Sequence, residues 1–249
     1  LAWFNLYMSV EVGEPASNTF KAKAGDLKRF LNYFRLTMRS DDPDLWTVST
    51  SKGFMTQLLR AKSERTGEKL APSTVNRMLA TLRNAARWIH RHRPFPAGFP
   101  LERVKDVQLS EPTWKGLSDT DITRLKAAAD QLLVIQTRSM QQPLRDQAML
   151  LVLLGTALRA SELIGLDVSQ YEGKHFRNVK RKGNNVTSQV FIPQDAREAV
   201  DRYIKEIRGS APGPLFQSRT GKALAPQNLA EALQRVAAQA NARLADGEQ

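Results

Sequence analysis

Residues 150–182 read LLVLLGTALRASELIGLDVSQYEGKHFRNVKRK, and this stretch decides how the second half of the chain folds. It opens with an apolar run, and a run that is apolar on every side predicts a buried helix. Arg159 and Glu162 follow three residues apart, a spacing that brings two side chains together on one helix face. About twenty residues later, a basic segment containing Arg181 and Lys182 predicts a β-hairpin.

An arginine beside a buried helix and a lysine on a turn suit the chemistry of a phosphate group. Arg159 stays charged and can bind two non-bridging oxygens through its planar guanidinium. Lys182 can bind a third oxygen or take part in proton transfer, and Glu162 is better placed to orient Arg159 than to act as a base. Taken alone, the Arg159–Glu162 spacing is also typical of an ordinary ion pair at a helix end. The order of the surrounding elements favours the phosphate site.

These residues carry a resemblance to a known family. Ala157–Leu163, ALRASEL, resembles the first active-site box of the tyrosine recombinases, which include phage integrases and Xer-type and integron-type enzymes. Lys182–Gly183, followed by a strand that ends at Ile192–Pro193, resembles that family's catalytic-lysine hairpin. The chain departs from the pattern at Ala157, where glycine is usual, and at residues 185–187, where another basic residue is usual.

The resemblance implies a mainly α fold with a small β component. An all-α core-binding (SAM-like) domain would precede a mixed α/β catalytic domain. It also implies site-specific cutting and rejoining of double-stranded DNA through a 3′-phosphotyrosyl intermediate, with Arg159, Lys182 and Glu162 as catalytic residues. No metal or nucleotide cofactor is implied, and the implied assembly is a homotetramer on two DNA sites.

The second half of the family's active site is not found in residues 1–249. A His-x-x-Arg box and the nucleophilic tyrosine are expected after the last helix, and neither occurs there. We therefore leave the nucleophile unassigned and expect this chain, taken alone, to be an incomplete and inactive portion of an enzyme. The alternative is a non-catalytic DNA-binding regulator or accessory protein derived from a recombinase.

Charge points independently to nucleic acid. The net charge is +12, and both halves of the chain contribute to it. Residues 1–112 contain eighteen Lys and Arg and eleven Asp and Glu, and residues 113–249 contain nineteen and fourteen. Such an excess of positive charge favours a polyanionic partner. We expect duplex DNA as this partner, rather than RNA or an anionic membrane surface. No apolar run approaches the ~20 residues of a membrane span. The lack of cysteine excludes disulfides, and the N-terminus lacks the basic region of a signal peptide. We expect a cytoplasmic, nucleoid-associated protein.

The order of helices and turns predicts two domains. We expect a helical DNA-binding domain at 1–105, a linker at 106–116 and a catalytic domain at 117–249. Predicted helices in the first domain cover 18–38, about 50–65 and 72–91. In the second domain we expect a helix capped by Ser118 and Asp121, a loop at 136–142, a buried helix from Pro143, strands at 175–180 and 188–192, and helices at 195–208 and 226–244.

The third predicted helix carries a basic stripe. Arg83, Arg87 and Arg91 are four residues apart, Arg77 precedes them on the same helix, and no acidic residue lies between Arg77 and Arg91. A salt-bridged surface helix normally alternates its charges. We therefore expect the stripe to contact the DNA backbone, together with Lys180 and Arg181 of the hairpin, although a solvated face is the ordinary alternative.

The histidines and tyrosines give no further candidate for a functional site. The three histidines, His90, His92 and His175, lack partners at metal-ligand spacing, so we expect no metal site. The four tyrosines all precede the last predicted helix, so none is expected to be the nucleophile.

Overall fold

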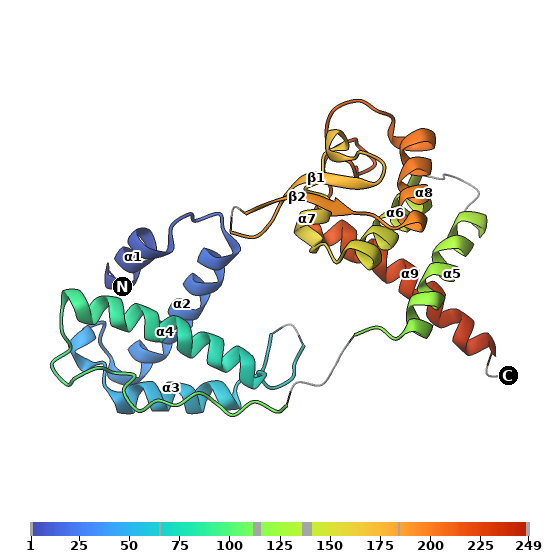
Figure 1. The fold of residues 1–249 in the computed structure, drawn as a ribbon. Helices are drawn as coiled ribbons and strands as arrows, with labels where there is room; N and C mark the ends of the chain where they lie inside the picture. Colours follow the sequence, from blue (N-terminus) through green and yellow to red (C-terminus); the bar gives the residue numbers. More distant parts are fainter. Residues whose placement is uncertain (1, 65, 112–115, 136–140, 184, 248–249) are drawn as a thin grey trace. The chain divides into compact units, whose positions relative to one another are not determined.

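A computed structural model describes residues 2–64, 66–111, 116–135, 141–183 and 185–247. The chain divides into two compact units, Leu1–Thr113 and Trp114–Gln249 (Figure 1). Over the described ranges the fold is mainly helical with one two-stranded sheet, which confirms the predicted class. Most of the predicted loop at 136–142 lies outside the described residues.

In its described residues, the first unit has four α-helices and a 3-10 turn at Pro43–Leu45. The α-helices are α1 (Ala2–Tyr7), which continues as a π-helical turn over Met8–Val12, then α2 (Asn18–Met38), α3 (Val48–Arg60) and α4 (Pro72–His92). The expected start of α2 is confirmed, because the Ser17 hydroxyl accepts the Phe20 amide at 3.1 Å. The expected end of α3 near residue 65 is wrong. After Arg60 the backbone turns extended, and Leu70 N donates to Ala61 O at 3.0 Å to close a turn.

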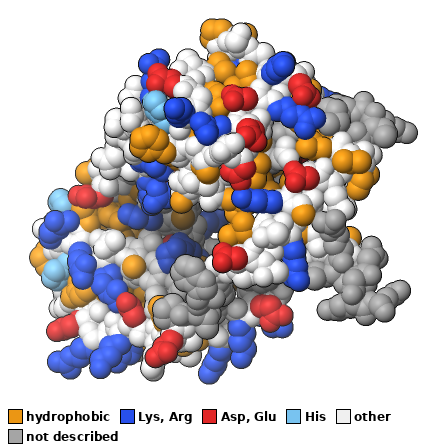
Figure 2. Space-filling model, turned by 45° about the vertical axis from the view of Figure 1, so that its right-hand side comes forward, with side chains coloured by type: hydrophobic (Ala, Val, Ile, Leu, Met, Phe, Trp, Pro, Cys, Tyr) orange, Lys and Arg blue, Asp and Glu red, His pale blue; other side chains and the backbone are white. Residues whose placement is uncertain are grey.

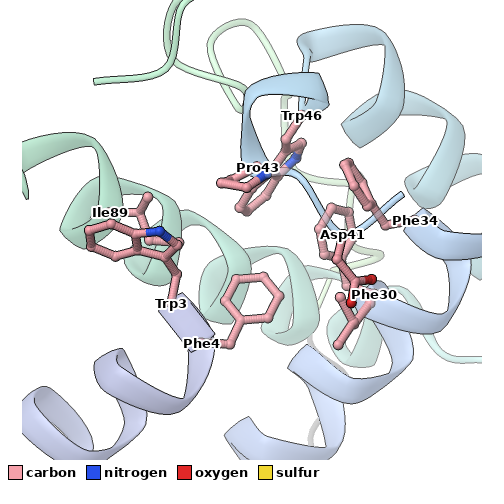
Figure 3. A pocket seen from close by; sticks show the side chains of 9 residues that line it. Trp3, Phe4, Phe30, Phe34, Asp41, Pro43, Trp46 and Ile89 are labelled. Carbon is pink, nitrogen blue, oxygen red and sulfur yellow. The ribbon is translucent and has the colours of Figure 1, made fainter. Parts of the chain in front are cut away.

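Helix α4 is the centre of the first core. One face of it, including Val75, Leu79 and Leu82, has no solvent exposure. Against it lies an aromatic cluster, in which the Phe30 and Trp46 ring centroids are 4.6 Å apart. Figure 3 shows Trp3 and Phe4 of α1 beside this cluster, where they line a small cavity together with Ile89 of α4. Helix α1 therefore covers the aromatic core.

The segment after α4 returns to that helix. Asn76 forms two hydrogen bonds with the backbone of Val107: its Nδ2 donates to Val107 O at 2.9 Å, and its Oδ1 accepts Val107 N at 2.7 Å. Val104 is buried in the first core. The first residues of the predicted linker, 106 and 107, are thus held against α4.

The second unit has five helices and a hairpin in the described residues. They are α5 (Asp119–Ile135), α6 (Gln141–Thr156), α7 (Ala160–Ile164), β1 (His175–Lys180), β2 (Val186–Phe191), α8 (Gln194–Tyr203), which continues as a π-helical turn over Ile204–Arg208, and α9 (Pro226–Gly247). The cap of α5 is confirmed, because Ser118 Oγ accepts Asp121 N at 3.1 Å and Asp121 Oδ2 accepts Ser118 N at 3.0 Å. The strands are antiparallel, with His175 opposite Phe191 and Lys180 opposite Val186.

Helix α6 is buried as predicted, although it begins at Gln141, two residues before the predicted start. It packs against α5, α8 and α9. Near its end, Gly155 leaves room for Pro193: a Cβ at residue 155 would overlap the proline ring. This close approach brings the end of the hairpin against the end of α6, from which the candidate site begins.

No helix in the described ranges has both the length and the apolar character of a membrane span.

Candidate active site

The ALRASEL box begins with a break in the helix. Helix α6 ends at Thr156, and Ala157 has a φ of 51°, in the left-handed region that disfavours residues with a Cβ. Arg159 is then the extended N-cap of α7. The expectation that one helix face carries Arg159 and Glu162 is therefore wrong. The two side chains still meet, because the third residue of a helix can reach back to its N-cap.

The strained alanine gives a stability prediction. Because glycine adopts this backbone conformation without a Cβ penalty, Ala157→Gly should raise the free energy of unfolding by about 0.5–1 kcal/mol, despite the greater freedom of glycine in the unfolded chain. Ala157 is exposed, so little burial is lost. Urea unfolding followed by circular dichroism measures the change. Ala230→Gly, at an exposed position inside α9, is the control and should lower stability by about 0.5–1 kcal/mol. A loss of stability in Ala157→Gly would contradict the prediction.

Glu162 binds Arg159 twice. Its Oε2 accepts the Arg159 backbone amide at 2.9 Å, and its Oε1 accepts Arg159 Nη1 at 2.9 Å. The amide hydrogen bond, followed by those from the Arg159 and Arg181 side chains, outweighs burial and lowers the pKa of Glu162 to about 2. A carboxylate this acidic stays charged near neutral pH and is a poor base. Its contacts suit the orienting role predicted for it.

Arg159 itself is available to a ligand. Its side chain is 64% exposed, although Glu162 beneath it is only 3% exposed. Nε and Nη2 have no hydrogen-bond partner among the described residues. The guanidinium therefore keeps one edge for Glu162 and presents its remaining donors to solvent, as binding two phosphate oxygens requires.

The hairpin joins this arrangement through Arg181. Its Nη1 donates to Glu162 Oε2 at 2.6 Å, and its Nε donates to Thr187 Oγ1 at 3.0 Å. The side chain is 24% exposed. Arg159 and Arg181 thus share one carboxylate from two elements distant in sequence. The sequence predicts instead that Arg181 contacts DNA and that Lys182 converges with Arg159.

Lys182 directly follows Arg181 at the start of the hairpin turn. Its side chain is exposed, as is that of Lys180. Neither ammonium group has an ion-pair or hydrogen-bond partner in the part of the chain that is described. Gly183, with a φ of 83°, has the conformation that a tight turn demands. The structure thus brings Arg159, Glu162 and Arg181 together and places Lys182 one residue from this group.

The basic stripe on α4 separates into two pairs. Arg77 Nη1 lies 2.5 Å from Oδ2 of the buried Asp26, and Arg83 Nη2 lies 3.0 Å from Asp106. These carboxylates are 51 and 23 residues away in sequence. A search of the helix sequence for acidic residues could not find them. Arg77 and Arg83 are therefore held by the fold of their own unit.

Arg87 and Arg91 are the exposed pair. Neither has an ion-pair or hydrogen-bond partner within the described ranges. With Lys23 of α2 they line a hollow over Tyr7 and Trp88. The sequence did not single out Lys23, because it lies on another helix. On the face shown in Figure 2, basic side chains are spread among acidic ones, and so a local group such as this matters more than the net charge.

Tyr171, Tyr203 and the three histidines have partners within their own units. Tyr171 OH donates to Asp201 Oδ1 at 2.7 Å, and burial together with this contact raises the pKa of Tyr171. Tyr203 is almost fully buried, and burial raises the pKa of Tyr203 as well. Neither is placed to attack a phosphate. Among the described residues, no group of three or more His, Cys, Asp or Glu side chains could hold a metal ion.

Comparison with known proteins identifies the family. The model of the phage integrase family matches residues 117–246. The tyrosine recombinase XerD of Listeria monocytogenes serovar 1/2a is 26% identical over 213 residues, which cover 85% of this chain and 66% of the relative. The tyrosine recombinase XerC of Thermodesulfovibrio yellowstonii is 24% identical over 237 residues, covering 89% and 70%.

Solved structures show the same fold. A lambda integrase tetramer bound to a Holliday junction matches with a TM-score of 0.68 at 13% identity, covering 96% of this chain and 65% of that one. The chain spans about two thirds of the length of the relatives it matches. The family match covers more than half of the chain, including the Arg159 box and the Lys182 hairpin, and the chain therefore belongs to the phage integrase family of tyrosine recombinases.

Proposed function

We propose that this chain is part of a site-specific DNA recombinase that cuts and rejoins duplex DNA through a 3′-phosphotyrosyl intermediate. The observation that carries the proposal is the shared carboxylate of Glu162, which links the box arginine Arg159 to the hairpin that bears Lys182. The family of the chain gives this geometry its chemical meaning.

Each group has a role in phosphoryl transfer. The exposed donors of Arg159 bind the non-bridging oxygens and stabilise the charge that develops on them. Lys182 gives a proton to the leaving 5′-oxygen. Glu162 stays ionised and fixes Arg159. The nucleophile is none of the four tyrosines in this sequence, because the two in the second unit are occupied and the others lie in the first unit.

The two units have different tasks in this proposal. We assign residues 1–105 to a core-binding domain, 106–116 to the linker and 117–249 to the catalytic domain. The lambda integrase match, described as a tetramer bound to a Holliday junction, supports a homotetramer on two DNA sites. The substrate would be double-stranded DNA of the nucleoid, in the cytoplasm.

DNA binding tests the first unit. Replacing both Arg87 and Arg91 by alanine should weaken duplex binding and reduce the slope of log K against log salt by about 1.8, since each phosphate contact contributes about 0.9. Fluorescence anisotropy over a salt series measures both quantities. Lys52→Ala/Arg60→Ala is the matched control: it removes the same charge from exposed positions on α3 and should leave the slope nearly unchanged.

Two outcomes would count against this interface. If the Arg87→Ala/Arg91→Ala variant and the wild type have equal salt slopes, Arg87 and Arg91 belong to a solvated surface and do not contact DNA. Stronger competition by duplex RNA than by duplex DNA would favour an RNA-binding protein over a recombinase.

A further inference from the structure

We infer that Arg181 is a positioning residue that holds Lys182 beside Arg159. This rests on the proposed function, since it takes Lys182 to be the proton donor. The starting observation is the isolation of the hairpin turn. The last residue pair of the two strands is Lys180–Val186. Beyond it, one further backbone hydrogen bond joins the two sides of the turn in the described residues: Arg181 N donates to Asn185 O at 2.7 Å.

Arg181 provides a tether from the turn to the rest of the unit. Among the described residues 181–183 and 185, its guanidinium contact with Glu162 is the one side-chain interaction that reaches α7. The same guanidinium binds Thr187 on β2 through Nε. It therefore joins both strands and α7 at one point. Lysine, with a single ammonium, could not reproduce two contacts from one planar group.

The position of the tether is defined relative to Arg159. Glu162 Oε2 accepts both Arg181 Nη1, at 2.6 Å, and the backbone amide of Arg159, at 2.9 Å. The hairpin is thus linked through one oxygen atom to the backbone of the phosphate-binding arginine. Because Lys182 is covalently next to Arg181, a shift of Arg181 moves the proton donor as well.

Burial separates this role from DNA binding. The side chain of Arg181 is 24% exposed, against 64% for Arg159 and 53% for Arg177. Its two observed contacts are to protein groups, whereas a phosphate contact needs free donors at the surface. Arg177 lies on β1 and is paired with Glu172 at 2.9 Å. Replacing Arg177 by alanine is therefore a control that removes the same charge without a change at Glu162.

The tether can be measured in residues 1–249. Arg181→Ala should speed hydrogen exchange at the amide of residue 181, relative to its intrinsic rate, by at least about tenfold, because this amide donates to Asn185 O at 2.7 Å and the turn loses a contact of its closed state. Arg177→Ala should leave exchange at that amide unchanged. In DNA binding, Arg181→Ala should change the salt slope no more than Arg177→Ala does. A slope lower by about 0.9 for Arg181→Ala alone would make Arg181 a phosphate contact.

The effect on chemistry needs a recombinase polypeptide that contains residues 1–249 and a nucleophilic tyrosine. There, Arg181→Ala should slow cleavage on the order of 10–100-fold through misplacement of Lys182. The defect should shrink on DNA whose scissile 5′-oxygen is replaced by sulfur, because a thiolate leaves without a proton. The Arg181→Ala/Lys182→Ala double variant should cleave no more slowly than Lys182→Ala. Arg181→Lys, which keeps the charge, should retain most of the defect.

The outcomes separate the two claims. Additive defects in the double variant, or a defect of Arg181→Ala that sulfur leaves undiminished, would overturn the positioning role. Unchanged exchange at the turn would do so as well. If the wild-type polypeptide forms no covalent DNA adduct, the proposed function fails, whereas the exchange data still decide whether Arg181 tethers the turn.

Discussion

Arg159→Ala should lower the rate of DNA cleavage by about 10²–10³, the loss expected when a well-placed donor to a developing oxyanion is removed. Arg159 is exposed above a buried carboxylate that fixes its backbone and one edge of its guanidinium. The remaining donors are free to bind the non-bridging oxygens of the scissile phosphate. Single-turnover cleavage of a nicked suicide substrate, in a recombinase polypeptide that contains this chain, measures the effect.

Two variants sharpen this test. Arg159→Lys keeps the charge but should recover little activity, because a point charge does not replace the bidentate fork. Arg177→Ala removes a charge elsewhere in the same unit and should leave the cleavage rate within a few fold. If Arg159→Lys cleaves at the wild-type rate, the arginine provides charge alone, and the bidentate contact is wrong.

Lys182→Ala should slow cleavage of an ordinary phosphodiester by about 10²–10⁴, the usual contribution of a general acid. Lys182 is exposed at the hairpin turn and has no partner among the described residues, so its ammonium is free to approach a leaving group. Substitution of sulfur for the scissile 5′-oxygen should remove most of the defect, since the thiolate needs no proton to depart.

The sulfur substrate distinguishes proton transfer from binding. Lys180→Ala, at the end of β1, where the side chain is equally exposed, should weaken DNA binding without a sulfur-dependent change in the cleavage rate. If Lys182→Ala is equally slow on both substrates, Lys182 binds or places DNA and the proton comes from another group.

Local signals predicted most of the helices and the components of the site. The cap at Ser17, the capping pair Ser118 and Asp121 and the apolar run of α6 depend on neighbours a few residues away, and each is present in the structure. The ALRASEL box and the lysine hairpin identified the family for the same reason, because short motifs carry the chemistry that the site requires.

The errors arose where a local pattern ended. Nothing in the sequence indicates that the helix stops at Thr156, because alanine normally favours helices, whereas Ala157 adopts a left-handed conformation. Helix α3 stops at Arg60 because residues 61 and 70 pair in a turn. In both cases the backbone departs from the helix that intrinsic propensity favours.

By itself, then, the sequence determined the fold class and the family, and it predicted Arg159, Glu162 and Lys182 as site residues, since these depend on residue types and short spacings. Only the tertiary structure decided which cations are free. Asp26 and Asp106 bind Arg77 and Arg83, and Glu162 binds Arg181, so that Arg87, Arg91 and Lys182 remain open. Ion pairs form between groups that are close in space, and a partner 51 residues away leaves no periodicity for a sequence to reveal.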